Sequence, residues 1–267
     1  MRITTAAAIT AIALAYATQA AADDYVQFST GIDYSSGDYG DTVDTDMLAV
    51  PFSVKVQRGN FDVKLTLPYV DVTGPEGVIP GDGGVRGPGN GNGNGNGGGG
   101  TANPVVSSRS GLGDAVLSAT YSMPIGESTW FDTTGKVKFP TASEAKFLGT
   151  GTTDFTLQGE LLHAFGPLSA SVRGGRRFNG SSDAYPLADV WQAGGGLYLA
   201  SGNSTFGLDY DWREGSLATS PDRSEITGSL TQKLNDRLRL QGYAYTGLAD
   251  GSPDIGAGAQ ILYRIGG

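Results

Sequence analysis

The chain alternates between apolar and polar residues over about ten positions at a time, and this alternation constrains its fold more than any other feature. In residues 61–69, FDVKLTLPY, every odd-numbered residue is apolar, and Asp62, Lys64 and Thr66 lie between them. A period of two gives an extended strand one apolar and one polar face. No amphipathic helix pattern interrupts the segments that carry it, which are residues 25–34, 46–57, 61–72, 113–124, 130–140, 154–165, 168–178, 189–200, 204–213, 224–233, 238–248 and 255–265.

The connections between these twelve segments alternate in length. Short links such as RGN, IGEST and LNDR lead from even to odd segments, whereas links from odd to even segments are mostly longer, as in SSGDYGDTVDT and TASEAKFLGTGTT. This asymmetry is typical of outer-membrane barrels, in which about ten residues tilted near 40° span an apolar band of roughly 25 Å. A soluble sandwich gives no reason for it, although a large lipocalin-like barrel shares the period of two. We therefore predict an all-β fold, a transmembrane antiparallel β-barrel of about twelve strands, with short periplasmic turns and long extracellular loops.

The beginning of the chain and its composition indicate where such a barrel would reside. Arg2, an apolar stretch at 6–17 and the small residues 20–22 predict a signal peptide at 1–22, followed by the barrel at 23–267 in the outer membrane of a Gram-negative bacterium. No cysteine is present, so disulfides and thiolate metal sites are excluded, and 27 acidic against 18 basic residues argue against nucleic acid as a partner. The expected partners are outer-membrane lipid, lipopolysaccharide and a small-molecule solute.

The run GPGNGNGNGNGGGG at 87–100 falls inside the longest predicted outer loop, residues 73–112. Glycine and asparagine bury too little surface to offset the entropy of ordering, so this run is either a solvated loop or a plug over the mouth. It lacks the regularly spaced aspartates of a calcium-binding repeat. The first loop is acidic, with Asp38, Asp41, Asp44 and Asp46, which either bridge divalent cations to lipopolysaccharide or are only solvated.

Three short motifs resemble a known family. Residues 110–124, SGLGDAVLSATYSMP, contain G-L-G-D at the start of a strand, and residues 136–175 contain F-P-T at a strand end and L-G-T-G before the next strand. These motifs resemble the outer-membrane proteins of the family named for the meta-pathway of phenol degradation, whose members are described as transporters. The resemblance implies a barrel and the passage of aromatic compounds. The Gly/Asn run is not part of the family's pattern.

Two-residue turns predict which residues face one another across a hairpin. A turn at 166–167 places Glu160 opposite Arg173, and a turn at 59–60 places Lys55 opposite Lys64, each pair on the face away from lipid. We expect Glu160 to pair directly with Arg173. Replacing Glu160 by glutamine should then cost more stability than removing a carboxylate that has no partner.

A turn at 202–203 places Asp209 and Asp211 beside glycines, with no direct partner across the hairpin. In a closed barrel of twelve strands, Lys55 and Lys64 would face these aspartates across the bore. Such charges either create a transverse field that orients polar solutes or pair to stiffen the interior. The side chains that we predict to line the lumen are Lys55, Lys64, Lys136, Lys138, Glu160, Arg173, Arg177, Tyr198, Asp209, Asp211, Arg239, Tyr243 and Tyr245.

The expected size of the barrel limits its function. Twelve strands about 4.8 Å apart and tilted near 40° give a backbone diameter of roughly 24 Å, which side chains reduce to about 10 Å or less. Only small solutes fit, and inward Tyr198, Tyr243 and Tyr245 either line an aromatic path or fill space. The single histidine, His163, is expected at the membrane interface, and neither G-x-S-x-G nor H-E-x-x-H occurs. We expect no enzyme activity, no metal site and no cofactor.

These observations favour an outer-membrane channel for the passive passage of small molecules, aromatic or hydrophobic ones included. Two alternatives stay open. The first is a barrel without transport whose loops serve adhesion or envelope structure, and the second, with less support, is an outer-membrane lipid-modifying enzyme.

Overall fold

The computed structural model describes residues 24–75, 78–80, 106–217 and 220–266. The predicted signal peptide at 1–22 and the Gly/Asn run at 87–100 lie outside these residues. A short 3-10 helix spans Glu144–Lys146, and no helix of the described part is long and apolar enough to cross a membrane. The strands are β1 (Tyr25–Gly37), β2 (Thr45–Arg58), β3 (Phe61–Pro75), β4 (Val106–Leu112), β5 (Ala115–Pro124), β6 (Thr129–Phe139), β7 (Asp154–Phe165), β8 (Leu168–Phe178), β9 (Val190–Ser201), β10 (Ser204–Arg213), β11 (Arg223–Lys233), β12 (Leu238–Gly247) and β13 (Ile255–Ile265).

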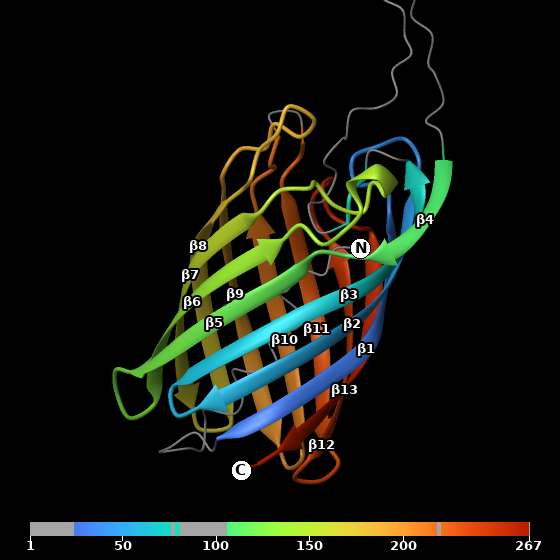
Figure 1. Ribbon diagram of the computed structural model, residues 1–267. Coiled ribbons are helices and arrows are strands. Elements are labelled where there is room, and N and C mark those ends of the chain that lie inside the picture. The colour runs from blue at the N-terminus through green and yellow to red at the C-terminus, as the bar shows by residue number, and fades with distance from the viewer. Residues whose placement is uncertain (1–23, 76–77, 81–105, 218–219, 267) are drawn as a thin grey trace, which may run out of the picture.

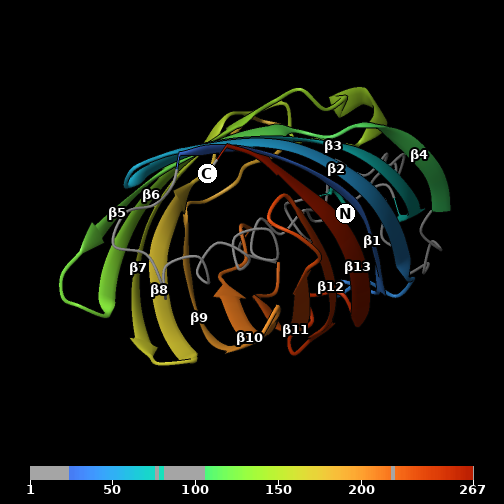
Figure 2. The same ribbon diagram turned by 90° about the horizontal axis from the view of Figure 1, so that it is seen from below.

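The strands form one closed antiparallel barrel (Figures 1 and 2). Except for β4 and β5, each strand pairs with its neighbours in the chain, β1 pairs with β13, and the pairing of β2 with β3 closes the wall. Strands β4 and β5 share one position, because β4 pairs with β3 from Tyr69 to Pro75 and β5 pairs with it from Phe61 to Thr66. The barrel therefore has twelve wall positions, as the sequence predicted.

The break between β4 and β5 falls at Gly113 and Asp114. The Gly113 N–H donates to the Pro68 carbonyl at 2.9 Å, and a Cβ at Gly113 would lie only 2.7 Å from the Pro68 ring. A side chain at position 113 would force the two strands apart, so this bulge requires glycine.

The two ends of the barrel differ as predicted. Residues 59–60, 125–128, 166–167, 202–203 and 234–237 make the short turns at one end, where β1 begins and β13 ends, and the longer connections lie at the other end (Figure 1). The outer loop predicted at 73–112 is shorter than expected, because β3 continues to Pro75 and Val106–Leu112 pairs with it. That stretch lacks apolar alternation.

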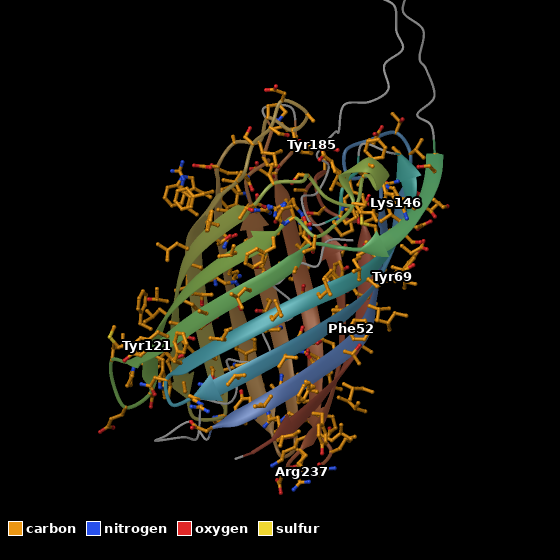
Figure 3. All side chains as sticks on the ribbon, in the orientation of Figure 1. Phe52, Tyr69, Tyr121, Lys146, Tyr185 and Arg237 are labelled. Carbon is orange, nitrogen blue, oxygen red and sulfur yellow. The ribbon has the colours of Figure 1, made fainter. Side chains whose placement is uncertain are left out.

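The outer surface carries a belt of large apolar side chains. Phe52, Tyr69 and Tyr121 project outward from the wall (Figure 3). Phe155, Leu157, Leu161 and Phe165 continue the belt on β7 at alternate positions, and many similar residues on the other strands are exposed. This surface suits a lipid environment and leaves the other face of each strand to line the interior.

Candidate functional site: the lumen

The predicted lumen residues occupy alternate strand positions between the outward apolar residues. Lys64, for example, lies between Val63 and the exposed Leu65. The pairings read from the turns are confirmed: Lys55 lies opposite Lys64 and Glu160 opposite Arg173. Asp209 and Asp211 lie beside Gly196 and Gly194 respectively.

Strand pairing brings five basic and three neutral polar residues into one continuous row, which we call the basic row. Its successive members are partners on neighbouring strands, and the row contains no carboxylate. It begins near the end of β13 at the short turns and ends near the end of β8 at the long loops. The row reads Arg264, Gln27, Lys55, Lys64, Ser118, Lys136, Thr156 and Arg177.

The members of the basic row differ in their partners. Lys55 Nζ lies 3.3 Å from an Asp62 carboxylate oxygen, and the Arg264 guanidinium lies 4.2 Å from the centre of the Tyr25 ring. Within the described part of the chain, the ammonium groups of Lys64 and Lys136 have neither a hydrogen bond nor an ion pair. These two lysines therefore keep their donors for water or a solute.

Arg173 is the centre of a dense ion-pair cluster. Its guanidinium binds both carboxylate oxygens of Asp211 at 2.7 Å and lies 3.5 Å from Asp209 and 3.9 Å from Glu160. Across the hairpin the two aspartates face only glycines, as expected, but they have a partner in Arg173, which comes from β8 outside that hairpin. A Cβ at Gly194 would lie 2.8 Å from Asp211 Oδ1 and 2.9 Å from Arg173 Nε, so this glycine of β9 leaves the gap through which β8 reaches β10.

The three lumen tyrosines donate to carboxylates. Tyr198 donates its hydroxyl to Asp209 at 2.5 Å, and Tyr243 and Tyr245 donate to Asp33 at 2.8 and 3.1 Å. These bonds orient the rings and satisfy acceptors that face the interior.

Of the other predicted residues, Arg239 lines a small cavity of about 20 Å³ at the short-turn end, together with Lys55, Lys64 and Arg264.

Two of the predicted cations meet at the other end of the lumen. Lys138 Nζ lies 2.8 Å from Asp154 and 3.4 Å from Asp114, and Arg177 pairs with the same Asp154 oxygen. Asp154 also accepts the Gly180 N–H at 2.9 Å. The structure thus brings Lys138 and Arg177 together, although they come from β6 and β8.

The three motifs of the family resemblance meet beside this cluster. In G-L-G-D, the Asp114 carboxylate accepts the Ala142 N–H at 2.9 Å. In F-P-T, the Thr141 hydroxyl donates to the Gly113 carbonyl at 2.9 Å and accepts the Ala115 N–H at 2.8 Å. In L-G-T-G, Thr150 accepts from Lys138 Nζ at 3.2 Å. The motifs therefore build one corner of the barrel.

This corner forms part of a cavity of about 120 Å³ in the lumen, which we call the outer cavity. The apolar part of its lining comes from β3, β5 and the β6–β7 loop. It adjoins a polar part from β6 to β10, since Val116 of β5 is the direct partner of Lys138. The apolar side includes Pro68, Val70, Val116 and Leu148. The polar side includes Lys136, Lys138, Asp154, Thr156, Arg177, Gln192 and Arg213.

The mouth of the barrel holds an apolar core that sequence reasoning missed. Tyr39 and Val78, from two different loops, pack with Leu148 against inward residues of β2 and β3 such as Met47. Burial raises the pKa of Tyr39 well above its usual value. A second apolar cluster joins Ile79 to Tyr185 and Leu187 of the β8–β9 loop. The only sequence signal for these two clusters was the isolated apolar residues in otherwise polar loops.

Arg109 holds the end of β3 and Val78 in place. Its Nη2 donates to the carbonyls of Pro75 and Val78 at 3.1 and 2.6 Å, and its Nη1 donates to that of Gly74 at 3.2 Å. Buried carbonyls need donors, and one buried arginine here serves three of them. The end of β3 and Val78 are thereby tied to β4.

The structure also places His163 and the acidic residues of the first loop. His163 lies on the outward face of β7 near the short turns, where Nδ1 is 2.7 Å from the Thr129 hydroxyl and the ring contacts Phe165. Of the acidic residues predicted in the first loop, Asp38 accepts the Gly40 N–H at 2.8 Å, and Asp46, which lies in β2, accepts the Tyr34 hydroxyl at 2.7 Å. The described residues contain no group of three or more side chains placed to bind a metal ion.

Comparisons with known proteins bear on the fold. No protein-family model matches the chain, and no curated protein matches it in sequence. Similar solved structures include the NanC porin (TM-score 0.55, 9% identity, 90% of this chain and 99% of that one) and the KdgM porin (0.53, 9%, 89% and 98%). The β domain of the Bordetella autotransporter Brka is similar too (0.55, 10%, 91% and 100%). At these identities the likeness shows the fold, an outer-membrane type of β-barrel.

Proposed function

We propose that this protein is an outer-membrane channel of a Gram-negative bacterium through which small solutes pass passively. Its environment would be outer-membrane lipid and lipopolysaccharide, which the apolar belt suits. The porins among the similar structures support a channel, and the autotransporter domain shows that this fold also serves other tasks. The resemblance to the phenol-degradation family adds aromatic molecules to the candidate solutes.

The basic row carries this proposal. A barrel that served only as an anchor would gain stability from pairing its inner charges, yet Lys64 and Lys136 stay unpaired in the described part of the chain. Unpaired cations that recur along a wall attract anions and let them move between sites. The row extends from the short-turn end to the long-loop end, as a permeation path requires.

Conductance of the purified protein in planar bilayers tests the proposal. We expect discrete current steps in potassium chloride and a reversal potential that favours chloride in a salt gradient. Liposome swelling with small sugars and with aromatic acids would then rank the solutes. A folded barrel that neither conducts nor admits solute would contradict the proposal and favour an adhesive or structural role.

A lipid-modifying enzyme is the third candidate, and the lumen offers it little. The only histidine faces outward and contacts a threonine and a phenylalanine. No described residue therefore forms a nucleophile–histidine pair inside the barrel. Hydrolysis assays on phospholipid test this candidate directly. Release of fatty acid at a rate that depends on the folded barrel would revive it.

A further inference from the structure

We propose that the outer cavity is a binding site for a small organic anion with an apolar body, such as a carboxylate on one aromatic ring or short acyl chain. This inference rests on the proposed function and names the solute class that the channel would select. It is carried by three observations: an excess of positive charge, an apolar wall beside that charge, and space of the right size.

The charge of the cavity favours an anion. Four cationic side chains line it, and only two carboxylates do, those of Asp114 and Asp154. Both carboxylates are already engaged by Lys138, and Asp154 is also engaged by Arg177. Lys136 lines the same space and has no ion pair or hydrogen bond in the described part of the chain, so its ammonium is available to a ligand carboxylate.

The adjoining apolar wall favours an apolar body. Pro68 and Val70 come from β3, Val116 comes from β5, and Leu148 is tucked in from the β6–β7 loop. Leu148 is held by the apolar core of the mouth and is 1% exposed, so this wall is fixed by packing. Inorganic ions gain nothing from such a wall, whereas every CH₂ or ring CH group that a ligand buries against it adds to the affinity.

The size of the cavity limits the ligand. A cavity of about 150 Å³ holds one benzene ring, so a space of about 120 Å³ limits the ligand to roughly one small ring or one short chain. Gln192 and Thr156 line the cavity and supply neutral donors that a carboxylate can use beside Lys136.

Calorimetric titration of the folded protein in detergent tests the site without requiring conduction. The probes are benzoate, its neutral isostere benzamide, and acetate, which has the charge without the body. We expect benzoate to bind at least about tenfold more tightly than either, since loss of one charge-assisted hydrogen bond or of a ring-sized apolar contact costs 1.5 kcal/mol or more. Equal binding of benzoate and benzamide, or no benzoate binding, overturns the inference.

Variants locate the site. Lys136→Gln should weaken benzoate binding by about tenfold, whereas Lys136→Arg keeps the charge and should retain most of the affinity. Val116→Thr, which changes shape little, should weaken benzoate binding and leave acetate unaffected. Lys64→Gln is the matched control, because Lys64 is the other unpaired lysine of the basic row but lies outside this cavity.

The outcomes separate the two proposals. If Lys64→Gln weakens benzoate binding as much as Lys136→Gln does, benzoate binds elsewhere and the inference is overturned. If benzoate binds as expected but the protein does not conduct, the channel proposal fails and the binding site stands. Migration on gels before and after boiling verifies that each variant is folded, and a folded Lys136→Gln with unchanged benzoate affinity also overturns the inference.

Discussion

Arg173 and Lys136 are inward-facing cations of the same barrel wall, two strands apart, and their surroundings differ. Arg173 lies within 4 Å of carboxylate oxygens from three residues on β7 and β10. The Lys136 ammonium, in contrast, has no such partner among the described residues. Charges of the first kind hold strands together, and charges of the second kind remain available for a solute. The same substitution should therefore lower stability when it is made at Arg173 and change selectivity when it is made at Lys136.

The largest expected effect is that of Arg173→Met. The substitution leaves Asp209 and Asp211 without their cation, so we expect the free energy of unfolding to fall by about 3 kcal/mol. Denaturant titration in detergent, followed by circular dichroism, measures it. Lys136→Met is the matched control and should change stability by less than about 0.5 kcal/mol. Equal losses for the two variants would contradict the comparison.

The second effect concerns the carboxylates around Arg173. Asp211→Asn should cost about 2 kcal/mol, because Asp211 binds the guanidinium with both oxygens, whereas Glu160→Gln should cost about 1 kcal/mol or less at 3.9 Å. This order reverses the one that the hairpin register alone predicts. The same titration decides between them, and a greater loss for Glu160→Gln would restore the sequence-based expectation.

A smaller effect is expected from Tyr198→Phe. The hydroxyl donates to Asp209, which Arg173 approaches only at 3.5 Å, so removal should cost about 1 kcal/mol. Tyr243→Phe is a comparison within the same barrel, since Asp33 keeps a second donor in Tyr245. We expect the Tyr198 change to cost more, and the reverse order in thermal melts would indicate that Asp209 relies on Arg173 alone.

The smallest effect on stability belongs to Lys64→Gln, which removes a charge that has no hydrogen bond or ion pair among the described residues. Its consequence should lie in selectivity, with a decrease of about twofold in the permeability ratio of chloride to potassium. Reversal potentials in a salt gradient measure it. An unchanged ratio in a conducting barrel would mean that the basic row does not lie on the ion path.

Much of the wall could be predicted from the sequence. The twelve wall positions, the two classes of connection and the register of the three hairpins follow from a period of two and from two-residue turns. These signals are local, because side chains alternate between faces and a tight turn fixes its own rungs. They identified which residues face the interior and the Glu160–Arg173 pair within one hairpin, but not the contacts between strands that are not neighbours.

The tertiary structure alone decided the contacts between strands that are not neighbours. Arg173 reaches Asp211 across β9 because Gly194 leaves a gap there, and a hairpin register does not extend to a third strand. The inward packing of Val78 and Leu148 had no periodic signal, since each is a single apolar residue in a polar loop. Alternation along a strand is imposed by backbone geometry and can be read from the sequence, whereas contacts across the lumen depend on closure of the barrel, which brings together residues far apart in the chain.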